Sequence, residues 1–208
     1  MLAKVFSSAV VGLDAVPIEV EVDIASQGLP SFTIVGLPDK AVEEAKERVR
    51  SAIRNSGADF PAKRITVNLA PADLPKEGPS YDLPIALGIL IASEQVTADV
   101  SHALFAGELS LDGRIRSITG VLPQAIMAQE HHFSDVYVPD ENTAEAAILK
   151  EVTVYPVVTL TALLLHLTKQ SLLTPILLTD LKDTPSENSG YDMQDIKGQH
   201  QAKRALEI

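Results

Sequence analysis

Residues 66–91 read TVNLAPADLPKEGPSYDLPIALGILI, and the rest of the fold can be placed around them. The alternation in residues 63–69 (KRITVNL) predicts a strand. A Gly-Pro-Ser turn at 78–80 follows, and then residues 82–93 (DLPIALGILIAS), which are apolar nearly all round. A helix that is apolar on every side is buried. We therefore expect a strand, a serine-bearing loop and a central helix in this order.

The residues before this stretch predict a small sheet. Ile18 to Ile24 (IEVEVDI) alternates apolar and acidic residues, which is typical of a half-buried strand. Residues 3–12 (AKVFSSAVVG) and 31–36 (SFTIVG) predict neighbouring strands, and Gly12 and Gly28 mark the turns between them. The expected arrangement is an antiparallel meander.

A helix is predicted to begin at Pro38, because proline suits the first helical position. Gly57 is expected to end it. Its apolar stripe consists of Val42, Ala45, Val49, Ala52 and Ile53.

The second half of the chain alternates short strands with helices. Residues 104–109 and 113–117 flank an Asp-Gly step and predict a hairpin. Further strands are expected at 135–138 and 152–156, and helices at 121–129, 142–150 and 159–170. Because strands and helices mix without strict alternation, the fold class is α+β or mixed α/β.

Composition narrows the chemistry. The 208 residues include no cysteine, which excludes disulfides, thiolate metal sites and cysteine nucleophiles. The net charge of −11 repels phosphate backbones overall, so nucleic acid would need a local basic patch. We find no convincing signal peptide, and the apolar run at 160–178 is too interrupted for a membrane span. We expect a cytoplasmic protein without membrane contact.

The chain divides into three parts. Residues 1–179 are predicted to form one domain, because this length buries a sizeable core. Residues 180–192 (DLKDTPSENSGYD) have the composition of a linker. Residues 193–208 predict the start of a further helical module.

The segment around Ser80 resembles the Lon-protease-type domain, which shares the ribosomal S5 domain 2-like fold. In that family a Gly-Pro-Ser loop presents a nucleophilic serine, and Ser80 falls on it. Together with residues 31–57 and 106–125, the pattern most resembles the amino-terminal domain of Mg-chelatase-like AAA+ ATPases of the ComM competence-protein type. The resemblance covers most of residues 1–170.

Residues 195–208 (DIKGQHQAKRALEI) resemble the opening of the AAA+ module in the same family. The resemblance implies that Ile196, Gly198 and Gln199 approach adenine in the whole protein. The sequence contains no G-x-x-x-x-G-K-[ST] loop, so the module is expected to be truncated and this chain to bind no cofactor. ATP and Mg would belong to the whole protein.

The same resemblance implies a bacterial, hexameric motor that acts on DNA as a helicase, with branch migration in natural transformation as its role. Within it, we expect this chain to be a scaffold or ring-assembly module.

A peptidase of the Lon type needs a lysine to take the serine proton. Aligned with that family, the lysine position is Leu122, and no lysine lies between Lys76 and Lys150. The sequence therefore predicts no catalytic residue. Residual peptidase activity at Ser80, with Lys76 as a non-standard base, is an alternative.

Without such activity, Ser80 is expected to cap the helix that begins near Asp82, because a serine hydroxyl accepts hydrogen bonds from helix-start N–H groups.

Three other groups of residues are candidates for sites. The basic residues that could contact DNA are Arg48, Arg50, Arg54, Lys63 and Arg64, although pairing with acidic neighbours on the helix explains them equally well. His131 and His132 are adjacent and predict a surface helix end rather than a metal site. Asp73 and Glu77 predict a solvated loop or an inter-subunit contact.

Overall fold

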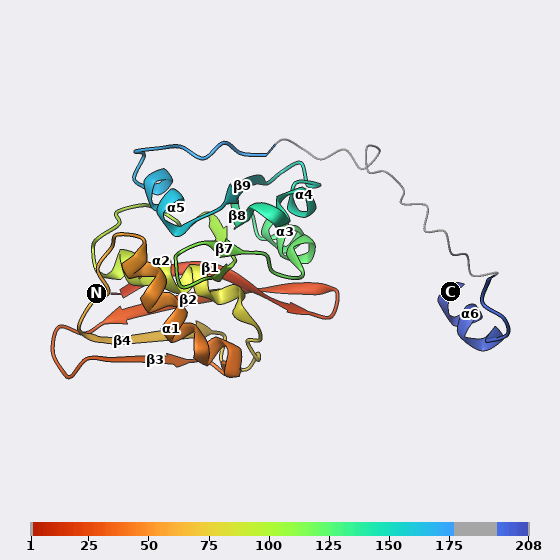
Figure 1. Cartoon of the computed structure of the whole chain (residues 1–208), viewed down its shortest axis with the longest axis horizontal. Helices are drawn as coiled ribbons and strands as arrows, with labels where there is room; N and C mark the ends of the chain where they lie inside the picture. The colour runs from red at the N-terminus through yellow and green to blue at the C-terminus, as the bar shows by residue number, and fades with distance from the viewer. Residues whose placement is uncertain (1, 177–194, 208) are drawn as a thin grey trace.

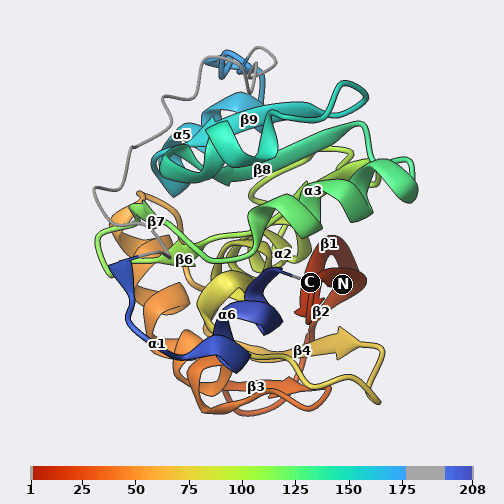
Figure 2. The same ribbon diagram turned by 90° about the vertical axis from the view of Figure 1, so that its right-hand side faces the viewer.

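The computed structural model describes residues 2–176 and 195–207. Seven strands form one mixed sheet in the order β3-β4-β2-β1-β5-β8-β9 (Figure 1). They are β1 (Leu2–Val11), β2 (Asp14–Ile24), β3 (Ser31–Val35), β4 (Arg64–Ala70), β5 (Ala103–Phe105), β8 (Asp135–Pro139) and β9 (Thr153–Val157). Figure 2 shows β9 and β3 at opposite ends of the sheet. The predicted mixed α/β class is confirmed.

A tight hairpin joins β1 to β2. Its two-residue loop begins at Gly12, whose φ of 66° fits the first position of a type II′ turn. β1 and β2 pair along their whole length, from Leu2 opposite Asp23 to Val11 opposite Asp14. This part of the predicted meander is confirmed.

The third strand of the meander was placed wrongly. β3 pairs in parallel with β4, and β4 lies between β3 and β2. The reason is the 16-residue helix α1 (Lys40–Asn55), which connects β3 to β4. A helical crossover returns the chain in the same direction, so the two strands it joins are parallel.

The buried stripe of α1 is the predicted one. The helix begins at Lys40 rather than Pro38, because the Asp39 side chain accepts a hydrogen bond from Val42 N–H and acts as the N-cap. The central helix α2 (Asp82–Ala92) is buried at every position but Ile91, as predicted.

Two groups of buried residues lie on opposite faces of the sheet. Alternate residues of β1 face different groups: Val5 belongs to the group around α2, whereas Phe6 packs against the group around α3 (Val121–Glu130). Helix α5 (Leu160–Leu167) contributes Leu160 and Leu163 to the α2 side. The sheet is therefore covered by helices on both faces.

The predicted hairpin around the Asp-Gly step exists but is smaller. It consists of β6 (Glu108–Leu109) and β7 (Ile115–Arg116) in a separate two-stranded sheet. Residues 104–105, which were assigned to the hairpin, lie in β5 of the main sheet. The helix expected at 142–150 shortens to a 3-10 turn (Asp140–Asn142) and α4 (Thr143–Ala146).

The predicted linker at 180–192 lies outside the described residues. Near the carboxyl end, α6 spans His200–Glu207, so the helix expected from residue 193 begins later in the described part. Among the described residues, no helix combines the length and the apolar character needed to cross a membrane.

Candidate functional site

The Gly-Pro-Ser loop is held from two sides. Gly78 N–H donates a hydrogen bond to Asp39 Oδ2 at 3.1 Å, and the Ser80 carbonyl accepts one from Gly107 N–H at 3.0 Å. Gly78 has a φ of 80°, which few side-chain-bearing residues adopt. A 3-10 helix (Pro79–Tyr81) then leads directly into α2. Ser80 therefore sits on a fixed backbone at the start of the central helix.

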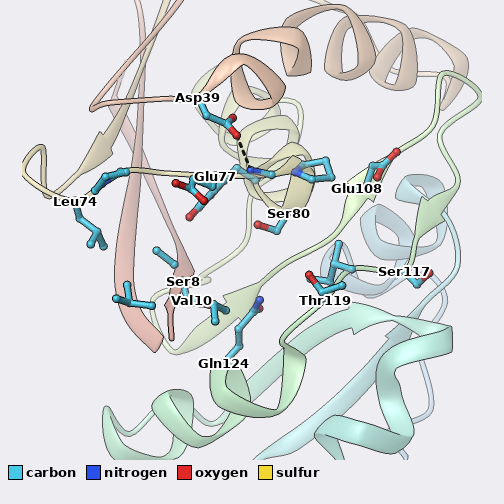
Figure 3. Close-up of a pocket in the computed structure, with 17 residues that line it drawn as sticks. Ser8, Val10, Asp39, Leu74, Glu77, Ser80, Glu108, Ser117, Thr119 and Gln124 are labelled. Atoms are coloured by element: carbon cyan, nitrogen blue, oxygen red, sulfur yellow. Dashed lines mark hydrogen bonds between the residues drawn. The ribbon is translucent and has the colours of Figure 1, made fainter. Parts of the chain in front are cut away.

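Ser80 faces a pocket of about 830 Å³ between this loop, the end of β1 and the segment that leads into α3. In Figure 3, Asp39 lies on one side of Ser80, and Ser8 and Gln124 lie on the other. The pocket is lined by Ser8–Val11, Asp39, Leu74, Pro75, Glu77–Tyr81, Glu108, Ser117–Thr119 and Gln124.

Ser80 is not the cap of α2, contrary to expectation. No side chain caps the start of α2, which continues from the 3-10 helix, and the Ser80 hydroxyl has no hydrogen-bond partner among the described residues. Because the chain enters α2 already coiled, no extended capping residue precedes it. The serine hydroxyl remains available to the pocket.

The residue two positions on, Asp82, is fully buried and fully paired. Arg48 of α1 donates to both carboxylate oxygens, from Nε at 2.6 Å and from Nη2 at 3.0 Å. Leu109 N–H donates a third hydrogen bond at 3.1 Å. Burial raises the pKa of Asp82 to about 6, and the hydrogen bonds and positive charge of Arg48 oppose this shift. This pair joins α1, α2 and β6.

Two positions were expected to matter for a base: Leu122, at the predicted lysine position, and Lys76, the alternative base. Neither residue lines the pocket with Ser80. Leu122 is not among its lining residues, and its N–H donates to Glu145 at 2.9 Å. Lys76 is buried, and its ammonium group donates to the Pro71 carbonyl. Burial lowers the pKa of Lys76, while Asp73 raises it. The lining residues described above include no lysine, arginine or histidine.

Two buried polar side chains at the pocket lack partners. Ser8 and Gln124 are each 1% exposed, and the Ser8 hydroxyl and Gln124 Oε1 have no hydrogen-bond partner among the described residues. Leaving a buried polar atom unpaired costs about 1–3 kcal/mol. The sequence singled out neither residue, because Ser8 lies in an ordinary strand pattern and Gln124, within residues 106–125, matches no catalytic position.

Of the five basic residues that could contact DNA, two have partners within the chain and three are exposed. Arg48 is committed to Asp82. Arg50 pairs with Glu47 at 3.2 Å and lies over the Phe60 ring, 5.3 Å from its centroid. The exposed residues of the set are Arg54, Lys63 and Arg64.

The remaining candidates lie apart from the pocket or at its edge. His131 and His132 are exposed just after α3, and among the described residues no group of histidine, cysteine and acidic side chains suits a metal ion. Asp73 and Glu77 are exposed in the loop before Ser80. Ile196, Gly198 and Gln199 precede α6, where Lys203 Nζ donates to the Ile196 carbonyl at 2.5 Å.

Comparison with known proteins identifies the family. The family model described as subunit ChlI of Mg-chelatase matches residues 20–142, which is more than half of the chain. This chain belongs to that Mg-chelatase-like family.

Its relatives are longer proteins. The competence protein ComM of Haemophilus influenzae is 45% identical over the whole chain, and the YifB protein of Escherichia coli is 44% identical. The chain spans 41% and 40% of their lengths. Lon protease 2 of Bacillus subtilis is 29% identical over 65% of this chain and 26% of its own length. The Lon-type resemblance predicted from residues 66–91 is confirmed.

Proposed function

We propose that this chain is the non-catalytic amino-terminal module of a cytoplasmic, ring-forming AAA+ ATPase that acts on DNA. The module serves as a scaffold for ring assembly, and ATP and Mg bind to the part of the protein that follows α6. Ile196, Gly198 and Gln199 would then approach adenine. The name of the ComM relative supports a role in competence, with branch migration during transformation as the proposed activity.

One observation carries the non-catalytic assignment: among the described residues, no lysine lines the pocket beside the serine of the Lon-type loop. Ser80 faces the pocket, but Leu122 does not line it and the Lys76 ammonium is bound to Pro71. A serine hydroxyl is a weak nucleophile unless an adjacent group takes its proton. In this proposal the chain keeps the fold of the peptidase domain but serves as a scaffold rather than as a peptidase.

Equilibrium sedimentation tests the scaffold role. The longer protein containing this chain would be compared with a form that lacks residues 1–180, with ATP present. We expect the intact form to assemble into hexamers and the shortened form to assemble less. Unchanged hexamer formation after removal of residues 1–180 would sink the scaffold proposal.

The alternative, a serine peptidase at Ser80, has its own test. A fluorescent casein-derived peptide would be incubated with the chain and with Ser80→Ala. We expect no cleavage above background with either protein. Cleavage that disappears in Ser80→Ala would establish a peptidase and overturn the non-catalytic assignment.

A second alternative is DNA contact, which the exposure of Arg54, Lys63 and Arg64 favours. Charge reversal at these three positions would then abolish binding and its dependence on salt. Measuring DNA binding by this chain and by the longer protein, side by side at several salt concentrations, separates the two cases. Binding by the longer protein alone assigns DNA recognition to the motor.

A further inference from the structure

The pocket beside Ser80 contains an unpaired strand edge. β1 pairs with β2 over its whole length, but on its other side it meets β5 only where Phe6 lies opposite Leu104. Beyond that point, the edge of β1 borders the pocket through Ser8 and Val10.

The hairpin geometry determines which backbone groups point into this space. In a hairpin with a two-residue loop, the residues that flank the loop, Val11 and Asp14, exchange hydrogen bonds. Because the pattern alternates, Ser7 and Ala9 also bond to β2, whereas Ser8 and Val10 direct their N–H and C=O groups away from it. Pro17 lies opposite Ser8. Because paired residues at this position exchange no hydrogen bonds, the missing N–H of the proline costs the β1–β2 pairing nothing. Among the described residues, Ser8 and Val10 form no backbone hydrogen bond across the edge of β1 that faces away from β2.

Side-chain groups around this edge also lack partners. Within residues 2–176 and 195–207, the buried Ser8 hydroxyl and Gln124 Oε1 have no hydrogen-bond partner, and neither has the Ser80 hydroxyl. Figure 3 shows Gln124 rising from α3 toward Ser80, with Ser8 beside them. The Ser80 hydroxyl, which faces the pocket, can accept from a backbone N–H or an ammonium group.

The charge of the pocket selects the sign of its ligand. Asp39, Glu77 and Glu108 line it, and no basic residue stands among the lining residues. Glu108 has Arg116 at 3.5 Å, whereas Glu77 is exposed and has no ion-pair partner in the described part of the chain. With a chain charge of −11, this favours a cationic partner.

We propose that the pocket beside Ser80 binds an extended, lysine- or arginine-containing peptide segment, which adds as a strand to the free edge of β1. The N–H and C=O groups of Ser8 and Val10 pair with the backbone of the segment. The Ser80 hydroxyl accepts from its donors, and the acidic residues hold its basic side chains. The proposed absence of a base keeps the bound segment intact.

Fluorescence anisotropy of the 208-residue chain tests this site. The probe is a fluorescein-labelled hexapeptide of alternating valine and lysine. We expect saturable binding, which weakens at least about tenfold when glutamate replaces lysine, and similarly when alternate backbone nitrogens are methylated. Methylation removes donors without changing charge, so it separates strand addition from simple attraction.

Variants of the chain locate the site. Gln124→Leu and Ser8→Val are expected to weaken binding about tenfold or more, because each replaces a polar side chain of the pocket wall with an apolar one. Ser7→Val is the matched control, since Ser7 is an equally buried serine whose alternate position directs it to the opposite face of the sheet. Circular dichroism would verify that each variant is folded.

The outcomes are distinct. Absence of saturable binding, or binding that is insensitive to methylation and to Gln124→Leu, overturns the strand-addition site. Mass spectrometry of the peptide after incubation tests the non-catalytic assignment separately: a cleaved peptide would contradict that assignment, whereas failure to bind would leave it standing.

Discussion

Ser80 and Asp82 are two residues apart, yet their surroundings differ in kind. Asp82 is buried with three hydrogen bonds that join two helices and a strand. Ser80 opens on a pocket where the Ser8 hydroxyl and Gln124 Oε1 are buried with no partner in the part of the chain that the structure describes. Paired buried polar groups hold a fold together, whereas unpaired ones cost stability unless a ligand satisfies them. The Asp82 half of this loop, with Arg48 and Leu109, therefore holds the fold together. The Ser80 half, with Ser8 and Gln124, presents its polar groups at the pocket.

The largest expected effect concerns the Asp82 half. Arg48→Met removes the partner of a fully buried carboxylate, and we expect it to lower the free energy of unfolding by about 3–5 kcal/mol. Urea denaturation measures the change. Arg54→Ala, an exposed arginine on the same helix, is the control and should change stability by less than about 0.5 kcal/mol. Equal effects at the two positions would contradict a structural role for the pair.

The pH dependence of stability gives the next largest effect. The pKa of Asp82 is raised from 3.8 to about 6 on folding, so the folded chain holds this proton over a pH range in which the unfolded chain has lost it. The stability associated with Asp82 is therefore fully present below about pH 4 and falls as the pH rises to about 6, by at most about 3 kcal/mol.

The control is Asp82→Asn, which cannot titrate. The difference in free energy of unfolding between the unaltered chain and this variant should decrease between about pH 4 and pH 6. A difference that stays constant over this range would show that burial does not raise this pKa.

The smallest expected effect concerns the Ser80 half. Ser8→Ala and Gln124→Leu remove polar atoms that have no partner, so we expect changes within about 1 kcal/mol, or slight stabilisation. Thermal denaturation without peptide measures this. A loss as large as that from Arg48→Met would mean that these side chains hold the fold together, and the contrast between the two halves would fail.

Much of the local structure was predictable. Period-two alternation located β2 and β4, and the all-apolar run located α2, because burial on one face or on all faces leaves a direct record in the residue order. Pairing was less accessible: β3 was assigned beside β2, but the crossover helix α1 placed it in parallel beside β4. Strand partners depend on the path of the chain, which local pattern does not encode.

The candidate site was likewise predictable where it depends on a local motif and not where it depends on contacts between distant residues. The Gly-Pro-Ser motif pointed to Ser80, and the alignment with the Lon-type family predicted Leu122 at the lysine position. An acidic residue at the start of an apolar helix was a signal for the buried Asp82. Its partner Arg48 is 34 positions away, and the sequence predicted for it either a DNA contact or pairing with acidic neighbours on its own helix.

The sequence by itself determined the Mg-chelatase-like family and the resemblance to the Lon-type domain, because these reside in residue types at fixed spacings. Only the tertiary structure decided which polar groups are satisfied. Ser8 and Gln124 lie far apart in the chain and meet at the pocket because β5 ends before it covers the edge of β1 and α3 begins across from that edge. Hydrogen-bond satisfaction is a property of neighbours in space, and it is there that the proposed peptide site arises.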